Sequence, residues 1–328
     1  MSAQLLTADL EAKPAAMTAL ADRLARRDPY AALPSLLDDE PAGILLLGLG
    51  ASRYACEMAA ARMRRAGLGA TAEYASALHS LPPGPDTLVV AVSVGGGLRE
   101  LCTALDRYVE QSAIIVLTDD PDSPVARYAD ILVPLMSGEE KSGLTCRGHV
   151  HALALLSLLG HRLGAPSAGA SSDLSLSLRR AANSVSGLLE RAPRWLPRAA
   201  EALHSPDDLH FVAPAERLCS AQQAALVVRQ GPVLPAHAAE SGEWSHTDRY
   251  LAAVSDYRAV LFAGSHYDER LTEQLLHLRG AFVCVGGDMA GSALNLRYPG
   301  DTDADVRLLT EPVVGELLAA HWWAERDL

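Results

Sequence analysis

Two short apolar runs that each end in a glycine-rich turn constrain the fold of this chain more than any other feature. The first covers residues 44–47 and turns at Gly48-Leu49-Gly50-Ala51-Ser52, and the second covers residues 87–92 and turns at Ser93-Val94-Gly95-Gly96-Gly97. A helical pattern follows each turn, and a helix N-terminus presents backbone N–H groups and a positive dipole end to an anion. The turns therefore predict a parallel sheet whose neighbouring loops bind a small anionic molecule, most simply a phosphate ester.

A nucleotide is the alternative ligand for the first turn. Gly48 and Gly50 match the first two glycines of the dinucleotide fingerprint G-x-G-x-x-G, but Arg53 occupies the position of the third. Glu73 lies at a suitable separation for a ribose contact, so this alternative stays open. It does not account for the second glycine turn.

Composition narrows the classes of partner. The chain has 328 residues, enough for two domains, and 49% of them are hydrophobic, enough to bury substantial cores. The formal net charge is −12, from 28 basic and 40 acidic residues. This balance argues against a nucleic-acid partner, because binding to a phosphate backbone depends on surplus lysine and arginine.

Membrane and disulfide signals are also missing from the sequence. No apolar run approaches the ~18 residues that span a bilayer, and no basic-then-apolar signal opens the chain. Five scattered cysteines form no C-x-x-C pair, so we expect neither a zinc site nor a disulfide framework. We expect a cytoplasmic protein without a membrane partner.

Strand-like and helical runs alternate in the first half of the chain, which predicts an α/β fold with a doubly wound parallel sheet. An amphipathic helix is expected over residues 7–27, with Thr7 as its candidate cap. The expected strands cover residues 44–47, 70–74, 87–92, 113–117 and 131–135, and the expected helices cover residues 54–66, 98–111 and 146–163.

The second half repeats this pattern in weaker form. After one or two helices over residues 174–203, strands are expected at 209–213, 259–263 and 281–285, with helices at 221–230 and 311–322. The expected divisions are an N-terminal helical segment (1–40), a first α/β domain (41–163), a linker with helices (164–205) that opens on the small, polar stretch 164–172, and a second α/β domain (206–328).

These features resemble the sugar isomerase (SIS) family. The two glycine turns are followed by a third segment, Gly138-Glu139-Glu140-Lys141-Ser142-Gly143-Leu144-Thr145-Cys146-Arg147, which leads into a helix. Leu10-Glu11-Ala12-Lys13-Pro14 resembles the Glu-x-x-Pro near the start of many members, and the stretch from Phe211 to Gly242-Glu243-Trp244-Ser245-His246 aligns without gaps to a family run ending in Gly-Glu-Leu-Lys-His. The architecture is similar to the isomerase half of glucosamine-6-phosphate synthase and to stand-alone phosphosugar isomerases and deglycases. It implies two SIS domains, each a flavodoxin-like parallel sheet flanked by helices.

The resemblance implies phosphate ligands in the two turns and in the third segment. In the family the second turn reads Ser-Gln-Ser-Gly-Glu-Thr, and its hydroxyls and amides hold the phosphate; here only the first hydroxyl remains. The backbone N–H groups of three consecutive glycines can still form an anion nest. The residues expected to bind substrate and phosphate are Gly50, Ala51, Ser52, Ser93, Val94, Gly95, Gly96, Arg99 and Thr145, with Glu140 near the ligand.

The catalytic positions depart further from the family pattern. The family's catalytic glutamate falls at Gln230, which cannot act as a base, and the lysine-bearing C-terminal tail has no counterpart before Leu328. Glu243 and His246 persist at matching positions, and if the segment is helical they share one face as a base and a proton carrier. His237, Glu240 and Gln230 are candidates for supporting roles behind this pair. His149 and His151 are interpreted as packing or solvent-facing residues and not as metal ligands, and no other cofactor is expected.

The changed positions favour elimination over isomerisation. A phosphorylated amino sugar that has opened to its aldehyde loses its acidic C2 proton to give an enediol-type carbanion, which either is reprotonated at C1 to a ketose or expels the C3 oxygen to give an unsaturated product. Reprotonation needs the base lost at Gln230, whereas elimination needs a base and an acid, which Glu243 and His246 can supply. We therefore expect a lyase or dehydratase acting on N-acetylglucosamine 6-phosphate or a related hexosamine 6-phosphate.

Two alternative functions stay open, and the resemblance also implies an oligomeric state. An aldose–ketose isomerase, deaminase or deglycase of the same substrate class is the first alternative, and a non-catalytic phosphosugar sensor is the second. The family habit implies a homodimer with a shared active site, in which His246 crosses to the other subunit.

Overall fold

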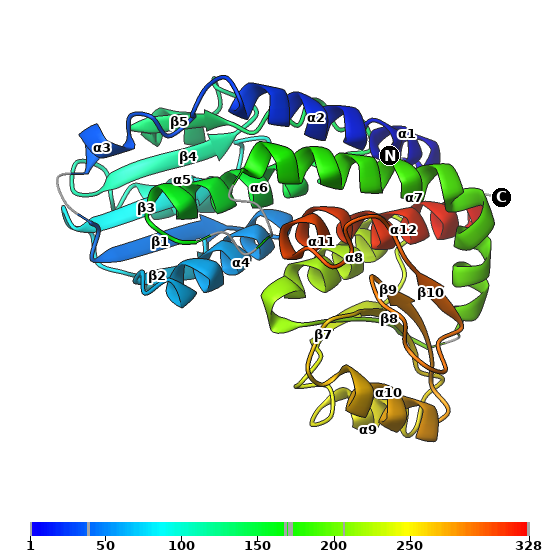
Figure 1. The fold of residues 1–328 in the computed structure, drawn as a ribbon. Coiled ribbons are helices and arrows are strands. Elements are labelled where there is room, and N and C mark those ends of the chain that lie inside the picture. The colour runs from blue at the N-terminus through cyan, green and yellow to red at the C-terminus, as the bar shows by residue number, and fades with distance from the viewer. Residues whose placement is uncertain (1, 38–39, 167–168, 170–172, 206, 327–328) are drawn as a thin grey trace. The chain divides into compact units, whose positions relative to one another are not determined.

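The chain folds into two compact units that are each discontinuous in sequence. The computed structural model describes residues 2–37, 40–166, 169, 173–205 and 207–326 (Figure 1). Unit 1 comprises Met1–Ala15, Glu140–Cys146 and Arg179–Leu328, and unit 2 comprises Ala16–Glu139 and Arg147–Leu178. This division differs from the four contiguous segments expected from the sequence, because the N-terminal residues and the segment Glu140–Cys146 belong with the second α/β half.

Unit 2 is built on a parallel sheet of five strands in the order β2-β1-β3-β4-β5. The order matches the flavodoxin-like arrangement that the sequence predicts. Its strands are β1 (Gly43–Gly48), β2 (Ala70–Tyr74), β3 (Thr87–Val92), β4 (Ala113–Thr118) and β5 (Ile131–Pro134). Its helices are α3 (Leu33–Leu36), α4 (Ala51–Arg65), α5 (Arg99–Leu105), the 3₁₀ turn η1 (Val125–Tyr128) and α6 (Arg147–Arg162).

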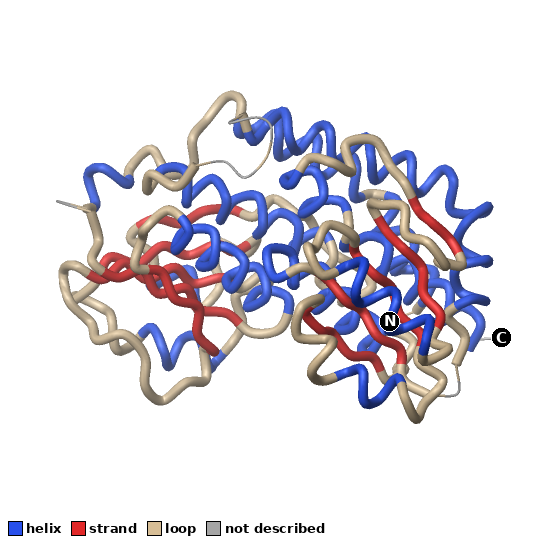
Figure 2. Tube along the Cα trace, turned by 60° about the horizontal axis from the view of Figure 1, so that its bottom comes forward, coloured by secondary structure: helices blue, strands red, loops and turns tan. Residues whose placement is uncertain are grey.

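Unit 1 repeats the same strand order in a second parallel sheet, β10-β9-β8-β6-β7. Its strands are β6 (Leu209–Ala213), β7 (Ala236–Glu240), β8 (Arg258–Phe262), β9 (Ala281–Val285) and β10 (Leu294–Leu296). Its helical elements are α1 (Ala3–Glu11), η2 (Ala215–Arg217), α8 (Leu218–Gln230), α9 (Asp248–Ala252), α10 (Asp268–His277), α11 (Ala304–Thr310) and α12 (Pro312–Arg326). Helices α2 (Lys13–Leu24) and α7 (Leu174–Ala202) each continue from one unit into the other. Figure 2 shows the strands of each sheet lying side by side with helices around them.

Burial on both faces explains why the central strands are continuous apolar runs. In β1, β3 and β4 every residue after the first is buried, as parallel sheets covered by helices require. The helix side of the unit 2 sheet packs Leu45, Val89 and Val116 against Leu101 and Tyr108. In unit 1 a corresponding cluster surrounds the fully buried Trp244 and Tyr257. No described helix is long and apolar enough to cross a membrane.

Some expected boundaries are wrong at the N-terminus. The single helix over residues 7–27 is two helices, α1 and α2, separated at Ala12. Pro14, the second residue of α2, lacks the N–H group that a continuous helix would need at that position. Ser2, not Thr7, caps α1 by accepting a hydrogen bond from the Leu5 amide (3.4 Å), whereas the Thr7 hydroxyl lies inside the helix and donates to the Ala3 carbonyl (3.0 Å).

Other differences concern short or irregular elements. The helix expected over 98–111 ends at Leu105, and the residues that follow form turns. Residues 174–203, expected as one or two helices, contain the single helix α7 with Pro193 and Pro197 inside it. In the expected linker stretch 164–172, residues 167–168 and 170–172 lie outside the described residues.

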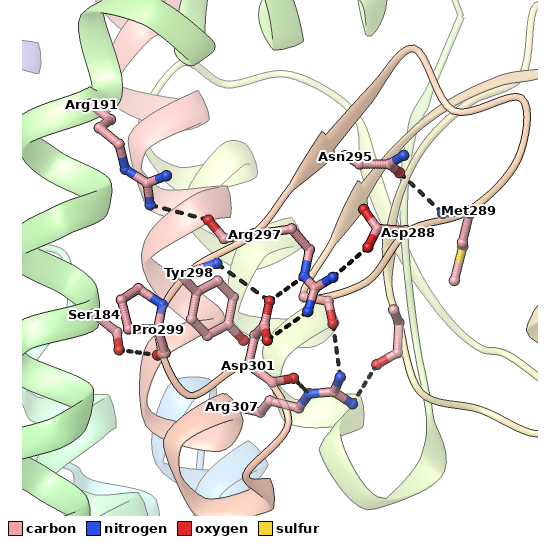
Figure 3. A network of polar contacts seen from close by, with 12 residues as sticks. Ser184, Arg191, Asp288, Met289, Asn295, Arg297, Tyr298, Pro299, Asp301 and Arg307 are labelled. Carbon is pink, nitrogen blue, oxygen red and sulfur yellow. Dashed lines mark hydrogen bonds and ion pairs between the residues drawn. The ribbon is translucent and has the colours of Figure 1, made fainter.

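A polar cluster ties α7 to the loop after β10 in unit 1 (Figure 3). The Arg297 guanidinium donates to Asp301 (2.9 Å) and also pairs with Asp288. The Ser184 hydroxyl on α7 donates to the Pro299 carbonyl (2.5 Å). The pKa of the Asp301 carboxyl is held below its ordinary value by the Arg297 hydrogen bond.

Candidate functional site

The first glycine turn presents the uncapped N-terminus of α4. Gly50 is its N-cap with a φ of 55°, a left-handed conformation that favours glycine, and no side chain caps the helix. The amides of Ala51, Ser52 and Arg53 therefore have no partner within the helix. Ser52 is buried, and its hydroxyl has no hydrogen-bond partner among the described residues. The turn offers both amides and a hydroxyl to an anion.

Two buried histidines on α6 hold the backbone of this unit. His149 Nδ1 lies 3.0 Å from the Ala51 carbonyl oxygen, and His151 Nδ1 lies 2.8 Å from the Leu135 carbonyl oxygen. Both side chains are buried. Of the two roles expected for them, packing is the one that the structure bears out, and His149 supports the first turn directly.

The second turn offers fewer amides than the sequence suggests. Its Gly96 amide donates to the Ser93 carbonyl (3.2 Å), so it closes the turn and is not available to a ligand. The expected nest of three glycine amides is corrected to two, Gly95 and Gly97, which have no partner among the described residues. The Ser93 hydroxyl likewise makes no hydrogen bond to the described part of the protein.

The two turns leave the same edge of the sheet side by side. Strands β1 and β3 are neighbours, with Leu47 opposite Ala91, and the chain order reverses between them. The crevice at such a switch point, outside the carboxyl ends of the strands, is where open α/β sheets bind ligands. The structure therefore brings Gly50, Ala51 and Ser52 together with the residues of the second turn.

Arg99 is exposed at the start of α5 and lies in a different hollow. This hollow of about 480 Å³ is lined by α5 and by residues 75–78, with Arg107 beside Arg99. The contribution of Arg99 to phosphate binding stays a prediction.

The equivalent edge of the second sheet is filled by the protein's own side chains. Asp268 accepts the amides of Gly264 (2.6 Å) and Ser265 (3.0 Å) after β8. Beside it, Arg217 pairs with Glu311 (2.9 Å), and burial raises the pKa of the Glu311 carboxyl. In this domain a carboxylate occupies amides that a bound anion would otherwise need.

The third segment belongs to unit 1. The Glu140 carboxylate accepts the Cys146 amide (2.6 Å), which anchors the segment at both ends. Thr145 is half-buried, and its hydroxyl has no hydrogen-bond partner in the described part of the chain. The Cys146 thiol is buried, and burial raises its pKa well above the ordinary value, so it is a poor nucleophile.

Glu243 and His246 lie on an exposed turn after β7. Both side chains are exposed, and the His246 amide donates to the Glu243 carbonyl (2.8 Å), so the two residues are one turn apart. The Glu240 carboxylate accepts the amides of Gly242 and Glu243, both at 2.8 Å. Glu240 thus fixes the start of the turn that carries the pair.

His237 and Gln230 lie away from this turn. His237 is near the amino end of β7, three residues from Glu240, which puts it about 10 Å away along the strand and on the opposite face. His237 Nε2 lies 2.8 Å from Asp208 Oδ2 instead. Gln230 is the last residue of α8 and is exposed.

A buried network that the sequence did not reveal supports the Glu243–His246 turn. The Trp244 indole donates to the Tyr257 hydroxyl (2.9 Å), which donates to Asp248 Oδ2 (2.8 Å). The His210 ring stacks on Tyr257 with centroids 3.9 Å apart. Burial raises the pKa of the Asp248 carboxyl, but hydrogen bonds from His210 and Tyr257 outweigh it and lower the pKa overall. The one sequence signal for this network is Trp244, whose indole N–H needs a hydrogen-bond partner when it is buried directly after Glu243.

The part of the chain that carries both glycine turns matches a known family. Residues 37–162 match the SIS domain family model. These residues form a SIS domain. Both glycine turns lie inside the matched range, so they are the turns of the SIS domain. No curated protein sequence shows significant similarity to the chain.

Solved structures share the fold over nearly the whole chain. Tagatose-6-phosphate ketose/aldose isomerase from Escherichia coli is 16% identical with a TM-score of 0.82, covering 99% of this chain and 95% of that one. The C-terminal domain of glucosamine-fructose-6-phosphate aminotransferase from Francisella tularensis is 17% identical with a TM-score of 0.79, covering 98% and 96%. Glucosamine-6-phosphate deaminase from Thermotoga maritima is 15% identical with a TM-score of 0.67, covering 99% and 95%. The chain therefore has the fold of two SIS domains.

Proposed function

We propose that this protein binds a hexosamine 6-phosphate and removes its C2 proton. The observation that carries the proposal is the pair of turns at the switch point of the SIS domain, where Ser52 and Ser93 hold unused hydroxyls beside unpaired amides. Three similar structures are named for enzymes of sugar phosphates. A phosphate at these turns would accept hydrogen bonds from both amides and hydroxyls.

The proposed chemistry assigns separate roles to two residues. Glu243 acts as the base that takes the C2 proton, and His246 acts as the acid that protonates the departing C3 oxygen. Their exposed side chains make no hydrogen bonds with the described protein, so both are available to a substrate. This makes a lyase or dehydratase of N-acetylglucosamine 6-phosphate or a near relative our first choice.

An isomerase, deaminase or deglycase of the same substrate class is the second candidate. The names of the isomerase and deaminase among the similar structures favour it. Gln230 weighs against isomerisation, because an amide cannot carry the second proton transfer. A phosphosugar sensor without turnover is the third candidate, and the same substitution supports it.

A homodimer with a shared site is part of the proposal. Directly after the exposed pair, α9 and its end present Tyr250, Leu251 and Val254 to solvent, with exposed fractions of 67%, 50% and 85%. Apolar side chains gathered in this way mark an interaction surface. A second copy that covers α9 would enclose His246 at the same time.

The cysteines support a proposal about the cellular location. All five cysteines are free thiols, as is usual for a reducing compartment. We therefore propose that the protein acts in the cytoplasm on phosphorylated sugars.

One experiment separates the three candidates. The protein is incubated with a panel of hexosamine 6-phosphates, and ultraviolet absorbance, ammonia and ketose are followed together. An absorbing unsaturated product indicates elimination, ammonia indicates deamination, and a ketose indicates isomerisation. Binding measured by calorimetry without any product indicates the sensor, and neither binding nor product would refute the phosphosugar proposal altogether.

A further inference from the structure

A charged pair is completely buried in unit 1. The Lys13 ammonium pairs with Glu316 Oε2, and the two side chains are 1% and 0% exposed. Lys13 is at the start of α2 and Glu316 is in the middle of α12. Replacement of a buried ion pair by apolar residues of similar size often leaves a protein as stable or more stable, so stability alone does not explain this pair.

Gln223 on α8 links the pair to the third segment of the candidate site. Its Nε2 donates to the Thr145 carbonyl (2.8 Å) and to Glu316 Oε1 (3.4 Å), and the side chain is fully buried. The Gln223 Oε1 atom has no partner among the described residues. The two hydrogen bonds of the Gln223 NH₂ group therefore determine the orientation of its side-chain amide.

The pairing of Glu316 with Lys13 matters for the orientation of the Gln223 amide. An ionised carboxylate only accepts hydrogen bonds, so it turns the NH₂ group of Gln223 toward itself and toward Thr145. A buried carboxyl without a cation would be neutralised by a proton, and a neutral carboxyl can donate to the amide oxygen instead. The amide could then flip and present its oxygen to the Thr145 carbonyl, which would repel it.

We infer that Lys13 is a positioning residue for the ligand-binding hydroxyl of Thr145. Its ammonium pairs with Glu316, Glu316 accepts an N–H of the Gln223 amide, and that amide holds the Thr145 backbone. The inference rests on the proposed function in one respect, that Thr145 contacts the phosphosugar.

The other anchors of the segment show that it is held from several sides. Asp9 on α1 accepts the Lys141 and Ser142 amides at 3.1 and 2.8 Å. The segment therefore remains attached when the Lys13 pair is removed, and the contact that is weakened is the one from Gln223 to the Thr145 carbonyl. The effect of the Lys13–Glu316 pair on Thr145 can therefore be measured while unit 1 stays folded.

The test compares Lys13→Met with the double variant Lys13→Met/Glu316→Leu. The single change leaves a carboxyl buried without its cation, so the thermal midpoint should fall. The double change removes both charges, so the midpoint should return most of the way to the wild-type value. Affinity of the double variant for glucosamine 6-phosphate, measured by calorimetry, should nevertheless be weaker by roughly tenfold, the effect of one hydrogen bond to a charged group.

Thr145→Val supplies the matched control. In a Thr145→Val background the double change should cause no further loss of affinity, because the hydroxyl that it positions is already absent. A folded double variant with wild-type affinity, or an equal loss in both backgrounds, would overturn the inference.

A readout without ligand separates this inference from the proposed function. Hydrogen exchange followed by mass spectrometry should be faster at Thr145 and Cys146 in the double variant than in the wild type. If the wild type binds no hexosamine phosphate, the proposed function fails. Unchanged exchange in the double variant would refute the positioning role, whatever the wild type binds.

Discussion

Gly95 and Gly96 are neighbours in one turn, yet a side chain would meet different surroundings at each. A Cβ atom on Gly95 would have no atom within 4 Å, whereas on Gly96 it would lie 2.0 Å from Ser123 Oγ, at a φ of 62°. Gly95 faces open space, and Gly96 faces the protein. The clean test of phosphate binding is therefore at Gly95.

We expect Gly95→Val to abolish or strongly weaken binding of glucosamine 6-phosphate while the thermal midpoint stays near the wild-type value. Gly96→Ala, the control, should lower stability by about 1–3 kcal/mol, because it combines a clash with a strained backbone. Calorimetric binding and thermal denaturation of both variants check this. A Gly95→Val variant that binds normally would mean that the second turn is only structural.

Glu243 carries the prediction about catalysis. Glu243→Gln keeps the size and hydrogen-bonding capacity of the side chain but removes the base, so deuterium exchange at C2 in heavy water should fall by roughly 10²–10⁴-fold. Glu269→Gln, at an exposed glutamate on α10, serves as a control and should exchange at the wild-type rate. Exchange at the wild-type rate in Glu243→Gln would place the base elsewhere, with Glu140 and Glu240 as the next candidates.

At the level of elements, the sequence predicted the central strands of both sheets and the edge strands β2 and β5 of unit 2, but it missed both edge strands of unit 1. Each of β1, β3, β4, β6, β8 and β9 is an apolar run buried on both sides, and such runs are visible without a structure. The strands β7 and β10 were not predicted. They lie at sheet edges, and their sequences Ala-His-Ala-Ala-Glu and Leu-Asn-Leu contain no β-branched residue.

The candidate site likewise contains some features that the sequence predicts and others that it does not. The glycine turns were predictable, because the local pattern of strand, glycine and helix determines them. The use of the Gly96 amide within its own turn was not, since it depends on backbone angles that the composition of Gly95-Gly96-Gly97 leaves free. The Gln223 link to Thr145 joins residues 78 positions apart, which no local pattern reports.

The loop after β10 carries a prediction about pH (Figure 3). The Arg297 hydrogen bond lowers the pKa of Asp301 below 3.8, so this carboxylate stabilises the fold above pH 4 and the contribution disappears as the pH falls further. Asp301→Asn should lower the free energy of unfolding by about 1–3 kcal/mol at pH 7. The difference from the wild type should shrink toward pH 3, as measured by urea denaturation.

Asp288 provides a matched control for that measurement, because it pairs with the same arginine but its side chain is 65% exposed. Asp288→Asn should change the free energy of unfolding by less than about 1 kcal/mol. Equal effects of the two substitutions at pH 7 would contradict the special role of Asp301.

The whole molecule is expected to work as a dimer, and Val254 tests this. Val254→Glu places a charge in the proposed interface and should shift the protein to monomers in sedimentation at micromolar concentration. The activity of the Val254→Glu variant should also fall, because in a monomer His246 no longer reaches the active site of the other subunit. Val233→Glu alters another exposed valine, 70% exposed, and should leave the assembly intact. A fully active wild-type monomer would sink the shared-site proposal.

The interleaved division of the chain has a consequence for synthesis on the ribosome. Lys13 is made well before its partner Glu316, which follows 303 residues later, and synthesis of that stretch takes roughly 15–60 s at 5–20 residues per second. Unit 2 is complete once Leu178 has emerged, whereas α1 must wait for α12, the last described helix, against which it packs. The nascent α1 exposes Leu6 and Leu10 during that interval, so a chaperone that shields the N-terminus should raise the yield of folded protein.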